Sequence, residues 1–290
     1  MAIDYKKLLN WPFKDVEQAY TARDTMLYAL GLGLGADPLD RTQLKYTYED
    51  GLVALPTMAV VLASPGFWVK DPASGVDWKK VLHGEQDLVI HKPLPASGTV
   101  IGRTRIDEII DKGAGKGAIA YSTREIREKA TGTLIAEVKS TGFWRGDGGF
   151  SGGFGGPTTP TPKPPSIPER APDLVADLKT LPQAALIYRL SGDYNPLHAD
   201  PEVAKSAGFD RPILHGLCTY GVAGWALLTH ACGCDANRLK RMSVRFSSPV
   251  YPGETVRTEI WREDNGRHAF RARAVERDVV VLNNGLAEVI

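Results

Sequence analysis

The chain has 290 residues, which is enough for two domains of ordinary size or one large one. Hydrophobic residues make up 43% and charged residues 24%, a composition typical of a soluble globular protein. The formal net charge of +1 provides no basic field for nucleic acid or a membrane, although a few local Lys and Arg residues are enough to hold an anionic small molecule.

The cysteines and the ends of the chain indicate a compartment. Cys218, Cys232 and Cys234 are too few for a disulfide framework, which indicates a reducing environment. The first residues lack the apolar core of a signal peptide, and no run approaches the roughly 18 apolar residues that span a bilayer. Residues 287–290 are not a peroxisomal address. We therefore expect a cytoplasmic protein with no membrane partner.

Residues 1–150 are predicted to form one unit in which helices precede strands. Residues 15–32 have the amphipathic pattern of a helix, and residues 55–63 form a short apolar run that fits a shortened central helix. Alternating segments typical of half-buried antiparallel strands follow, and they cover residues 100–109, 117–127 and 134–143.

A change of composition then divides the chain. Residues 151–172 are rich first in glycine and then in proline, and the run 157–165 can form neither a helix interior nor a central strand. A glycine-rich run can also cradle phosphates, but here no Lys-Ser or Lys-Thr pair follows it. We therefore predict a linker over residues 151–172.

Residues 173–290 are predicted to repeat the first unit. The turn at Pro249–Val256 aligns without a gap with the turn at Pro93–Val100, and each opens a series of strands. The helix predicted at Gly216–Ala231 is apolar around its whole circumference and must be buried. The most economical fold is α+β, in which an antiparallel sheet wraps a central helix and the unit is made twice. The second strand series covers residues 256–263, 268–275 and 279–288.

A carboxylate and an imidazole lie five residues apart in the segment that precedes this helix. Asp193 and His198 are separated by Asn195-Pro196, and proline keeps the residue before it out of helical geometry. The loop should therefore bend, so that the two side chains converge. Asp200 is followed by Pro201 and resembles a helix N-cap rather than a catalyst.

Gly216 begins the buried helix, where unpaired backbone N–H groups carry the positive end of the helix dipole. Such a group stabilises an oxygen that gains negative charge, as a thioester oxygen does when an enolate forms. Asp193 and His198 can hold one water between them, and the amide of Asn195 can orient a partner. Together these groups fit the addition of water to an α,β-unsaturated thioester.

The same segments resemble a known family. Ser191–His198 and Ala207–Thr219 resemble the MaoC-like, (R)-specific 2-enoyl-CoA hydratases, also called hydratase 2. The chain looks most similar to the two-repeat hydratase domain of peroxisomal multifunctional enzymes. Further matching segments are Tyr48-Glu49, Leu55–Thr57, Val81–Gln86, Lys92–Pro95, Ser151–Gly156 and Pro249–Gly253.

The resemblance implies a double hot-dog fold and the interconversion of trans-2-enoyl-CoA and (3R)-3-hydroxyacyl-CoA. It makes Asp193 and His198 the catalytic pair, with Asn195 assisting and Gly216 supplying the oxyanion N–H. The N-terminal half lacks the motif, so one site per chain is implied, and that half makes room for bulkier acyl groups. The resemblance also implies an acyl-CoA thioester substrate, a homodimer, no cofactor and no metal.

Other residues carry weaker hypotheses. Glu49 borders the pocket or forms a structural hydrogen bond, and Arg189 contacts CoA or forms a structural ion pair. His215 contacts the substrate or simply caps or packs at the helix start. His83 is expected to support the first sheet rather than to touch substrate.

Three rival functions stay open at this point. An acyl-CoA thioesterase could use the same fold and a similar acid/base pair, but it would release free thiol. A metalloenzyme could use His198, Asp200 and His215, which is a weak ligand set. A non-catalytic acyl-CoA-binding protein would bind the thioester without turnover and leaves the Asp193, His198 and Gly216 arrangement unexplained.

Overall fold

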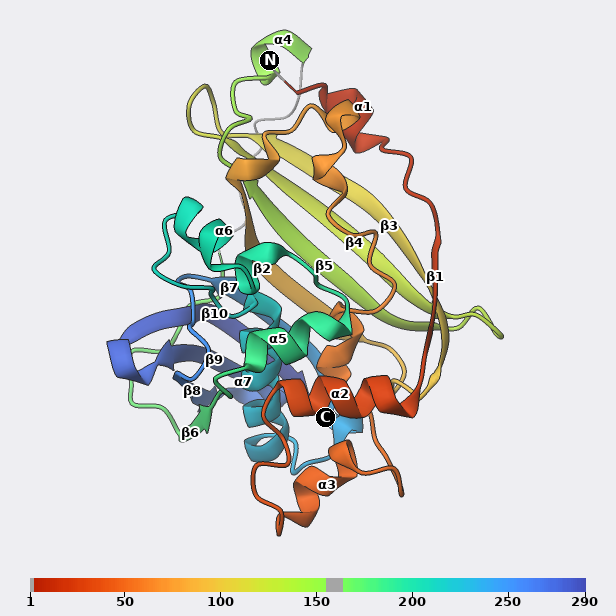
Figure 1. Ribbon diagram of the computed structural model, residues 1–290, viewed down its shortest axis with the longest axis vertical. Helices are drawn as coiled ribbons and strands as arrows, with labels where there is room; N and C mark the ends of the chain where they lie inside the picture. The colour runs from red at the N-terminus through yellow and green to blue at the C-terminus, as the bar shows by residue number, and fades with distance from the viewer. Residues whose placement is uncertain (1–2, 155–163) are drawn as a thin grey trace.

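The computed structural model describes residues 3–154 and 164–290 of the chain. Within these residues, ten strands form one antiparallel sheet in the order β1-β3-β4-β5-β2-β7-β10-β9-β8-β6 (Figure 1). The strands are β1 Val16–Tyr20, β2 Val81–Ile90, β3 Gly98–Asp111, β4 Ala118–Glu128, β5 Leu134–Trp144, β6 Leu174–Lys179, β7 Leu239–Phe246, β8 Thr255–Arg262, β9 Arg267–Ala274 and β10 Val279–Val289.

The sheet is continuous because β2 of the first half pairs with β7 of the second. Gln86 lies opposite Val244 and Leu88 lies opposite Met242 across this junction. The carboxylate of Asp87 accepts two hydrogen bonds of 2.9 Å from the guanidinium of Arg241 on β7, so the charged positions of this central pair satisfy each other. The two halves are therefore joined by a strand ladder rather than only by the predicted linker.

The helix α7 (Gly216–His230) lies at the centre of the second half, and 11 of its residues are buried. The corresponding place in the first half holds the 3₁₀ helix η1 (Pro56–Val60), which is buried throughout and packs against α7, β2 and β5. This arrangement is the expected α+β double hot-dog fold, with the first central helix reduced to little more than one turn. The other helices are α1 Tyr5–Leu9, α2 Ala22–Gly31, α3 Arg41–Thr47, α4 Ser151–Phe154, α5 Ala184–Tyr188 and α6 Pro201–Ser206.

The six predicted strands are β3, β4, β5, β8, β9 and β10, and each is found within two residues of its predicted bounds. The helix predicted over residues 15–32 is wrong in its first part. Residues 16–20 form the edge strand β1, which pairs with β3. The helix starts only after Thr21, whose backbone N–H and hydroxyl both donate to the Asp24 carboxylate. A capping box therefore sets the start of α2.

The first residues of the predicted linker are tied to the sheet. The carboxylate of Asp111 at the end of β3 accepts hydrogen bonds from the backbone N–H groups of Gly113, Gly149 and Ser151 at 2.7–2.8 Å. The short helix α4 begins at Ser151, where a linker is predicted. The rest of the proline-rich run up to residue 163 lies outside the described residues.

No helix among residues 3–154 and 164–290 is long and apolar enough to span a bilayer.

Candidate active site

The loop between α5 and α6 presents Asp193 and His198 through a bend and a short turn. Gly192 has a φ of +126°, a backbone conformation that favours glycine. The turn η6 (Pro196–His198) follows, and the Oδ1 atom of Asn195 caps it by accepting a hydrogen bond from the N–H of Leu197 at 3.2 Å. Asn195 is exposed and stabilises the turn that carries His198. The bend predicted from Asn195-Pro196 is therefore present.

His198 is buried and held in one tautomer. Its Nδ1 lies 2.9 Å from the backbone oxygen of Ile213. Because a carbonyl oxygen only accepts hydrogen bonds, Nδ1 carries the proton and Nε2 keeps a free lone pair. Burial lowers the pKa of His198, although the Ile213 carbonyl and the charge of Asp193 oppose this shift. At neutral pH the ring is thus an uncharged base beside Asp193.

His215 supports both members of the pair. Its ring stacks on His198 with centroids 3.8 Å apart, and its Nε2 donates to the backbone oxygen of Asp193 at 3.1 Å. Desolvation is the main cause that lowers the pKa of His215 to about 4, followed by the neighbouring His198. The residue is 1% exposed, so it acts on the site by holding the Asp193 backbone.

The nitrogen and oxygen donors of Asp193, His198 and His215 lie within 4.8 Å of one another, which makes them the candidates for holding a metal ion among the described residues. Each imidazole already uses one nitrogen to donate to a backbone oxygen, so one nitrogen per ring is left. Asp200, which the metalloenzyme hypothesis included, caps α6 by accepting hydrogen bonds from Glu202 and Val203. Its place in a metal site is therefore wrong, and the N-cap prediction is confirmed.

Gly216 lies at the first position of α7, directly after His215. Its backbone N–H has no acceptor among the described residues, and the residue is exposed. A Cβ atom at this position would lie 3.2–3.3 Å from the ring of Phe246, which is closer than ordinary contact. The position thus combines a free N–H, the positive end of a 15-residue helix and an open approach.

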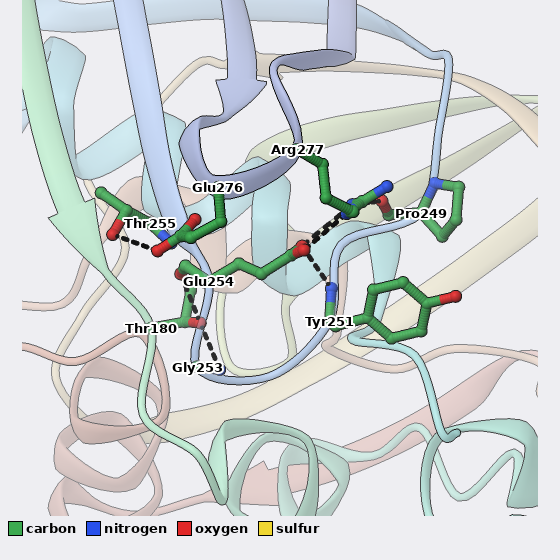
Figure 2. A network of polar contacts seen from close by, with 8 residues as sticks. All are labelled: Thr180, Pro249, Tyr251, Gly253, Glu254, Thr255, Glu276 and Arg277. Atoms are coloured by element: carbon green, nitrogen blue, oxygen red, sulfur yellow. Dashed lines mark hydrogen bonds and ion pairs between the residues drawn. The ribbon is translucent and has the colours of Figure 1, made fainter. Parts of the chain in front are cut away.

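A hydrogen-bond network around Glu254 holds the turn that contacts Leu214, next to the residue that orients His198. The carboxylate of Glu254 accepts hydrogen bonds from the N–H of Tyr251 at 2.8 Å and from the guanidinium of Arg277 (Figure 2). Burial alone would raise the pKa of Glu254, but these donors bring it below its usual value. The turn held in this way places the Val250 oxygen 2.7 Å from the N–H of Leu214. Leu214 follows Ile213, the partner of His198.

Two further predicted residues lie in different places. The guanidinium of Arg189 lies 4.9 Å from the ring centre of Tyr194, the residue that follows Asp193 in the chain. It forms no ion pair with a carboxylate of the described residues. Its predicted structural ion pair is therefore absent from the described residues. Glu49 is exposed in the turn after α3, and Tyr46 of α3 donates to the oxygen of Cys234, beyond the far end of α7. Glu49 is not brought to the pair, and its role stays a prediction.

Sequence reasoning missed that His83 of the first half lies near the groups around Gly216, since His83 was expected only to support the first sheet. His83 on β2 stacks with Phe246 at 4.7 Å, and the charge of Asp193 acts on its ring. Desolvation lowers the pKa of His83 to about 4, while one side of the residue stays exposed. No local spacing predicts this placement, because it depends on the pairing of β2 with β7.

A small cavity of mixed polar and apolar lining lies between the first half and the segment that precedes Asp193. The cavity has about 40 Å³ and is lined by Leu27, Met58, Leu62, Leu190 and Ser191, with the polar residues Gln18, Tyr20 and Asp24. Ser191 is two residues from Asp193, and its hydroxyl has no partner among the described residues. A wider, open cleft of about 480 Å³ at the β8–β9 turn contains none of the predicted site residues.

Known proteins match this chain over nearly all its length. Residues 18–146 match the MFE-2 hydratase 2 N-terminal domain, and residues 164–284 match the MaoC like domain. The chain is 40% identical over 297 residues to a probable enoyl-CoA hydratase 2 of Dictyostelium discoideum, with 99% of this chain and 97% of the relative covered. It is 43% identical over 276 residues to the 3-hydroxyacyl-thioester dehydratase Y of Mycobacterium tuberculosis, with 93% of each covered.

A solved structure agrees with these relatives. The crystal structure of a MaoC-like dehydratase from Phytophthora capsici matches with a TM-score of 0.85 at 38% identity and covers 98% of both chains. The fold, the position of the motif in the second half and the full-length identity all agree. The chain therefore belongs to the MaoC-like hydratase 2 family and is a hydro-lyase of the enoyl-CoA hydratase 2 type.

Proposed function

We propose that the chain adds water to trans-2-enoyl-CoA and forms (3R)-3-hydroxyacyl-CoA, with Asp193, His198 and the Gly216 N–H as the groups that act on the reacting atoms. The observation that carries the proposal is the tautomer of His198. Its Nδ1 is used by the Ile213 oxygen, so its Nε2 offers a lone pair beside the Asp193 carboxylate. The (3R) configuration rests on the family resemblance.

In this mechanism a water molecule lies between Asp193 and the Nε2 of His198. His198 takes one proton from the water while the water oxygen bonds to C3 of the enoyl group. The electron pair of the double bond moves to the thioester oxygen, which accepts a hydrogen bond from the Gly216 N–H. The imidazolium then returns its proton to C2, so that one water is added in total. Each acid/base group would contribute about 10²–10⁴ in rate.

The family resemblance implies that the first half receives the acyl chain. The small cavity between this half and the segment before Asp193 is lined by the apolar side chains of Leu27, Met58, Leu62 and Leu190, and it supports this direction for the chain. We therefore propose that the acyl group points into the first half while the thioester stays at Gly216.

The test follows the enoyl absorbance of crotonyl-CoA and of a longer trans-2-enoyl-CoA with purified protein, together with free thiol and the configuration of the product. Loss of absorbance with a (3R)-hydroxy product and no thiol is expected. Release of thiol with the enoyl absorbance retained would identify a thioesterase instead. Binding of the thioester without either signal would identify a non-catalytic acyl-CoA-binding protein.

We also propose a homodimer in the cytoplasm, which rests on the family resemblance and on the sequence features described above. Sedimentation of the purified chain tests the dimer, and a monomer would contradict it.

A further inference from the structure

Two exposed aromatic side chains meet on the segment that leads into β2. Phe67 is 47% exposed and Trp78 is 38% exposed, and their ring centres lie 6.2 Å apart at 90°. Trp68 follows Phe67 in the chain, and its ring centre lies 5.3 Å from that of Trp11 and 6.2 Å from that of Trp144. The backbone that carries Phe67 is therefore held against an aromatic cluster of the first half.

Two lysines lie over these rings without neutralising partners. The Nζ atom of Lys70 is 4.8 Å from the centre of the Trp78 ring and 5.6 Å from that of Phe67, and the Nζ atom of Lys79 is 5.8 Å from the Trp78 ring. Neither forms an ion pair with a carboxylate of the described residues. Lys80, in contrast, pairs with Asp77 at 2.8 Å. We call Phe67, Lys70, Trp78 and Lys79 the aromatic-lysine platform.

The platform is connected to the catalytic site by a short stretch of chain. Trp78–Lys80 form the 3₁₀ helix η4, which continues directly into β2, and His83 on β2 stacks with Phe246, whose ring lies 3.2–3.3 Å from the Cβ position of Gly216. An extended chain covers at most ~3.3–3.6 Å per residue, so Trp78 and His83 are at most about 18 Å apart at their Cα atoms. The pantetheine arm of an acyl-CoA is itself an extended chain between the thioester and the nucleotide.

We propose that the aromatic-lysine platform binds the nucleotide of the CoA substrate, with the adenine stacked on Trp78 or Phe67 and the phosphates held by Lys70 and Lys79. Exposed aromatic rings are platforms on which nucleobases stack, and lysine is a common phosphate ligand. This inference rests on the proposed function, because it places the thioester at Gly216 and the nucleotide toward the start of β2.

A second group of cations near the site has a different explanation. The guanidinium groups of Arg211 and Arg277 lie 4.8 and 5.1 Å from the centre of the Tyr251 ring. Arg277 is already paired with Glu254 and bonded to the Pro249 oxygen, in the network that supports the His198 loop (Figure 2). This group therefore has a structural role that the platform lacks. Arg211→Ala therefore compares the arginines at Tyr251 with the aromatic-lysine platform as contacts for the nucleotide.

The experiment compares crotonyl-CoA with crotonyl-pantetheine, which lacks the nucleotide. The ratio of kcat/KM for the two substrates is measured for the wild type, Lys70→Ala/Lys79→Ala, Trp78→Ala, Arg211→Ala and Lys45→Ala. Lys45 is an exposed lysine on α3, at the other end of α7, and serves as the matched control. Binding of adenosine 3′,5′-bisphosphate is measured by calorimetry on the same proteins, so the nucleotide contact is read without turnover.

We expect the preference for crotonyl-CoA to fall at least ten-fold in the double lysine variant and in Trp78→Ala, mainly through a higher KM. Binding of the bisphosphate should weaken in parallel, and Lys45→Ala should keep the wild-type ratio. An unchanged ratio in the platform variants would overturn the inference, as would a loss confined to Arg211→Ala. Equal losses with both thioesters would also overturn it, because they would indicate a structural defect. If the wild type hydrates either thioester, the proposed function stands even where the platform variants show no change, so failure of this inference is distinguishable from failure of the proposed function.

Discussion

Substitution of Gly216 by alanine separates the oxyanion role of this residue from its role in the fold. The added Cβ would lie 3.2 Å from Cε1 and 3.3 Å from Cδ1 of Phe246, so the ring would have to move by a few tenths of an ångström. That ring also packs on His83, and the added methyl group lies beside the N–H that the proposed mechanism assigns to the thioester oxygen. Alanine is otherwise well suited to a helix.

Alanine keeps the N–H of residue 216, but the methyl group crowds the approach to it, and loss of access to one oxyanion donor costs about 10²–10³ in kcat in other enzymes. We therefore expect the kcat of Gly216→Ala with crotonyl-CoA to fall by about 10²–10³, while the free energy of unfolding changes by less than about 1 kcal/mol. Stopped-flow absorbance gives kcat, and urea denaturation gives the stability.

Two further variants make the test specific. Gly152→Ala adds the same methyl group where nothing lies within 4 Å, and it should leave kcat within about three-fold of the wild type. Gly216→Ala combined with Phe246→Leu removes the crowded ring. Recovery in that double variant is expected, because relief of the crowding restores access to the N–H of residue 216. A kcat of Gly216→Ala within three-fold of the wild type would refute the reasoning that the thioester oxygen approaches this N–H past the Phe246 ring.

Three other predictions concern the pair, its cap and the linker. If neutral His198, whose pKa burial lowers, is the base as proposed, kcat/KM should fall at acid pH. In Asp193→Asn the charge that opposes this shift is gone, so the acid limb of the pH–rate profile should move to lower pH. An acid limb near the ordinary histidine pKa would contradict the effect of burial. Asp200→Ala should lower the free energy of unfolding, measured in urea, by about 1 kcal/mol but keep kcat within a few-fold of the wild type. A large loss of kcat would indicate that Asp200 takes part in catalysis. Asp111→Asn should lower the free energy of unfolding by about 2 kcal/mol at pH 7, because the carboxylate accepts hydrogen bonds from three backbone N–H groups. Burial alone would raise the pKa of Asp111, but donors at Ser151, Gly149 and Gly113 bring it to about 2, so the stabilisation is present above the ordinary aspartate pKa and is lost as the pH falls toward 2. Equal stability of the two proteins at pH 7 would contradict this prediction.

The parts of the fold that were predictable are those with a local signal. The strands β3 and β8 alternate because one face is buried, and their turns contain residues that adopt positive φ, such as Asn265 at 58° and Gly266 at 72°. The central strands β2 and β7 alternate over only part of their length. Their charged residues Asp87 and Arg241 satisfy each other across the junction, which is visible only after the strands pair. The helical prediction over residues 16–20 fails because the pairing of the edge strand β1 with β3 is not local and leaves no signal in the sequence of β1.

The site divides in the same way. The convergence of Asp193 and His198 is predictable from the proline between them, and the N-cap role of Asp200 is predictable from its position before Pro201. The stacking of His215 on His198 and the arrival of His83 beside Asp193 could not be predicted. Both depend on how segments far apart in the sequence pack, and a lone histidine has no spacing that indicates its partner.

The most direct test of the account measures Asp193→Asn beside Asp200→Asn with crotonyl-CoA. The two residues lie in one segment, and asparagine at position 200 still caps α6. The two variants therefore differ mainly in whether the lost carboxylate is the one proposed to hold the reacting water. We expect kcat to fall by about 10²–10⁴ in Asp193→Asn and to stay within a few-fold in Asp200→Asn, with both proteins folded by circular dichroism. Comparable kcat values for Asp193→Asn and the wild type would contradict the assignment of Asp193 and His198 as the hydrating pair.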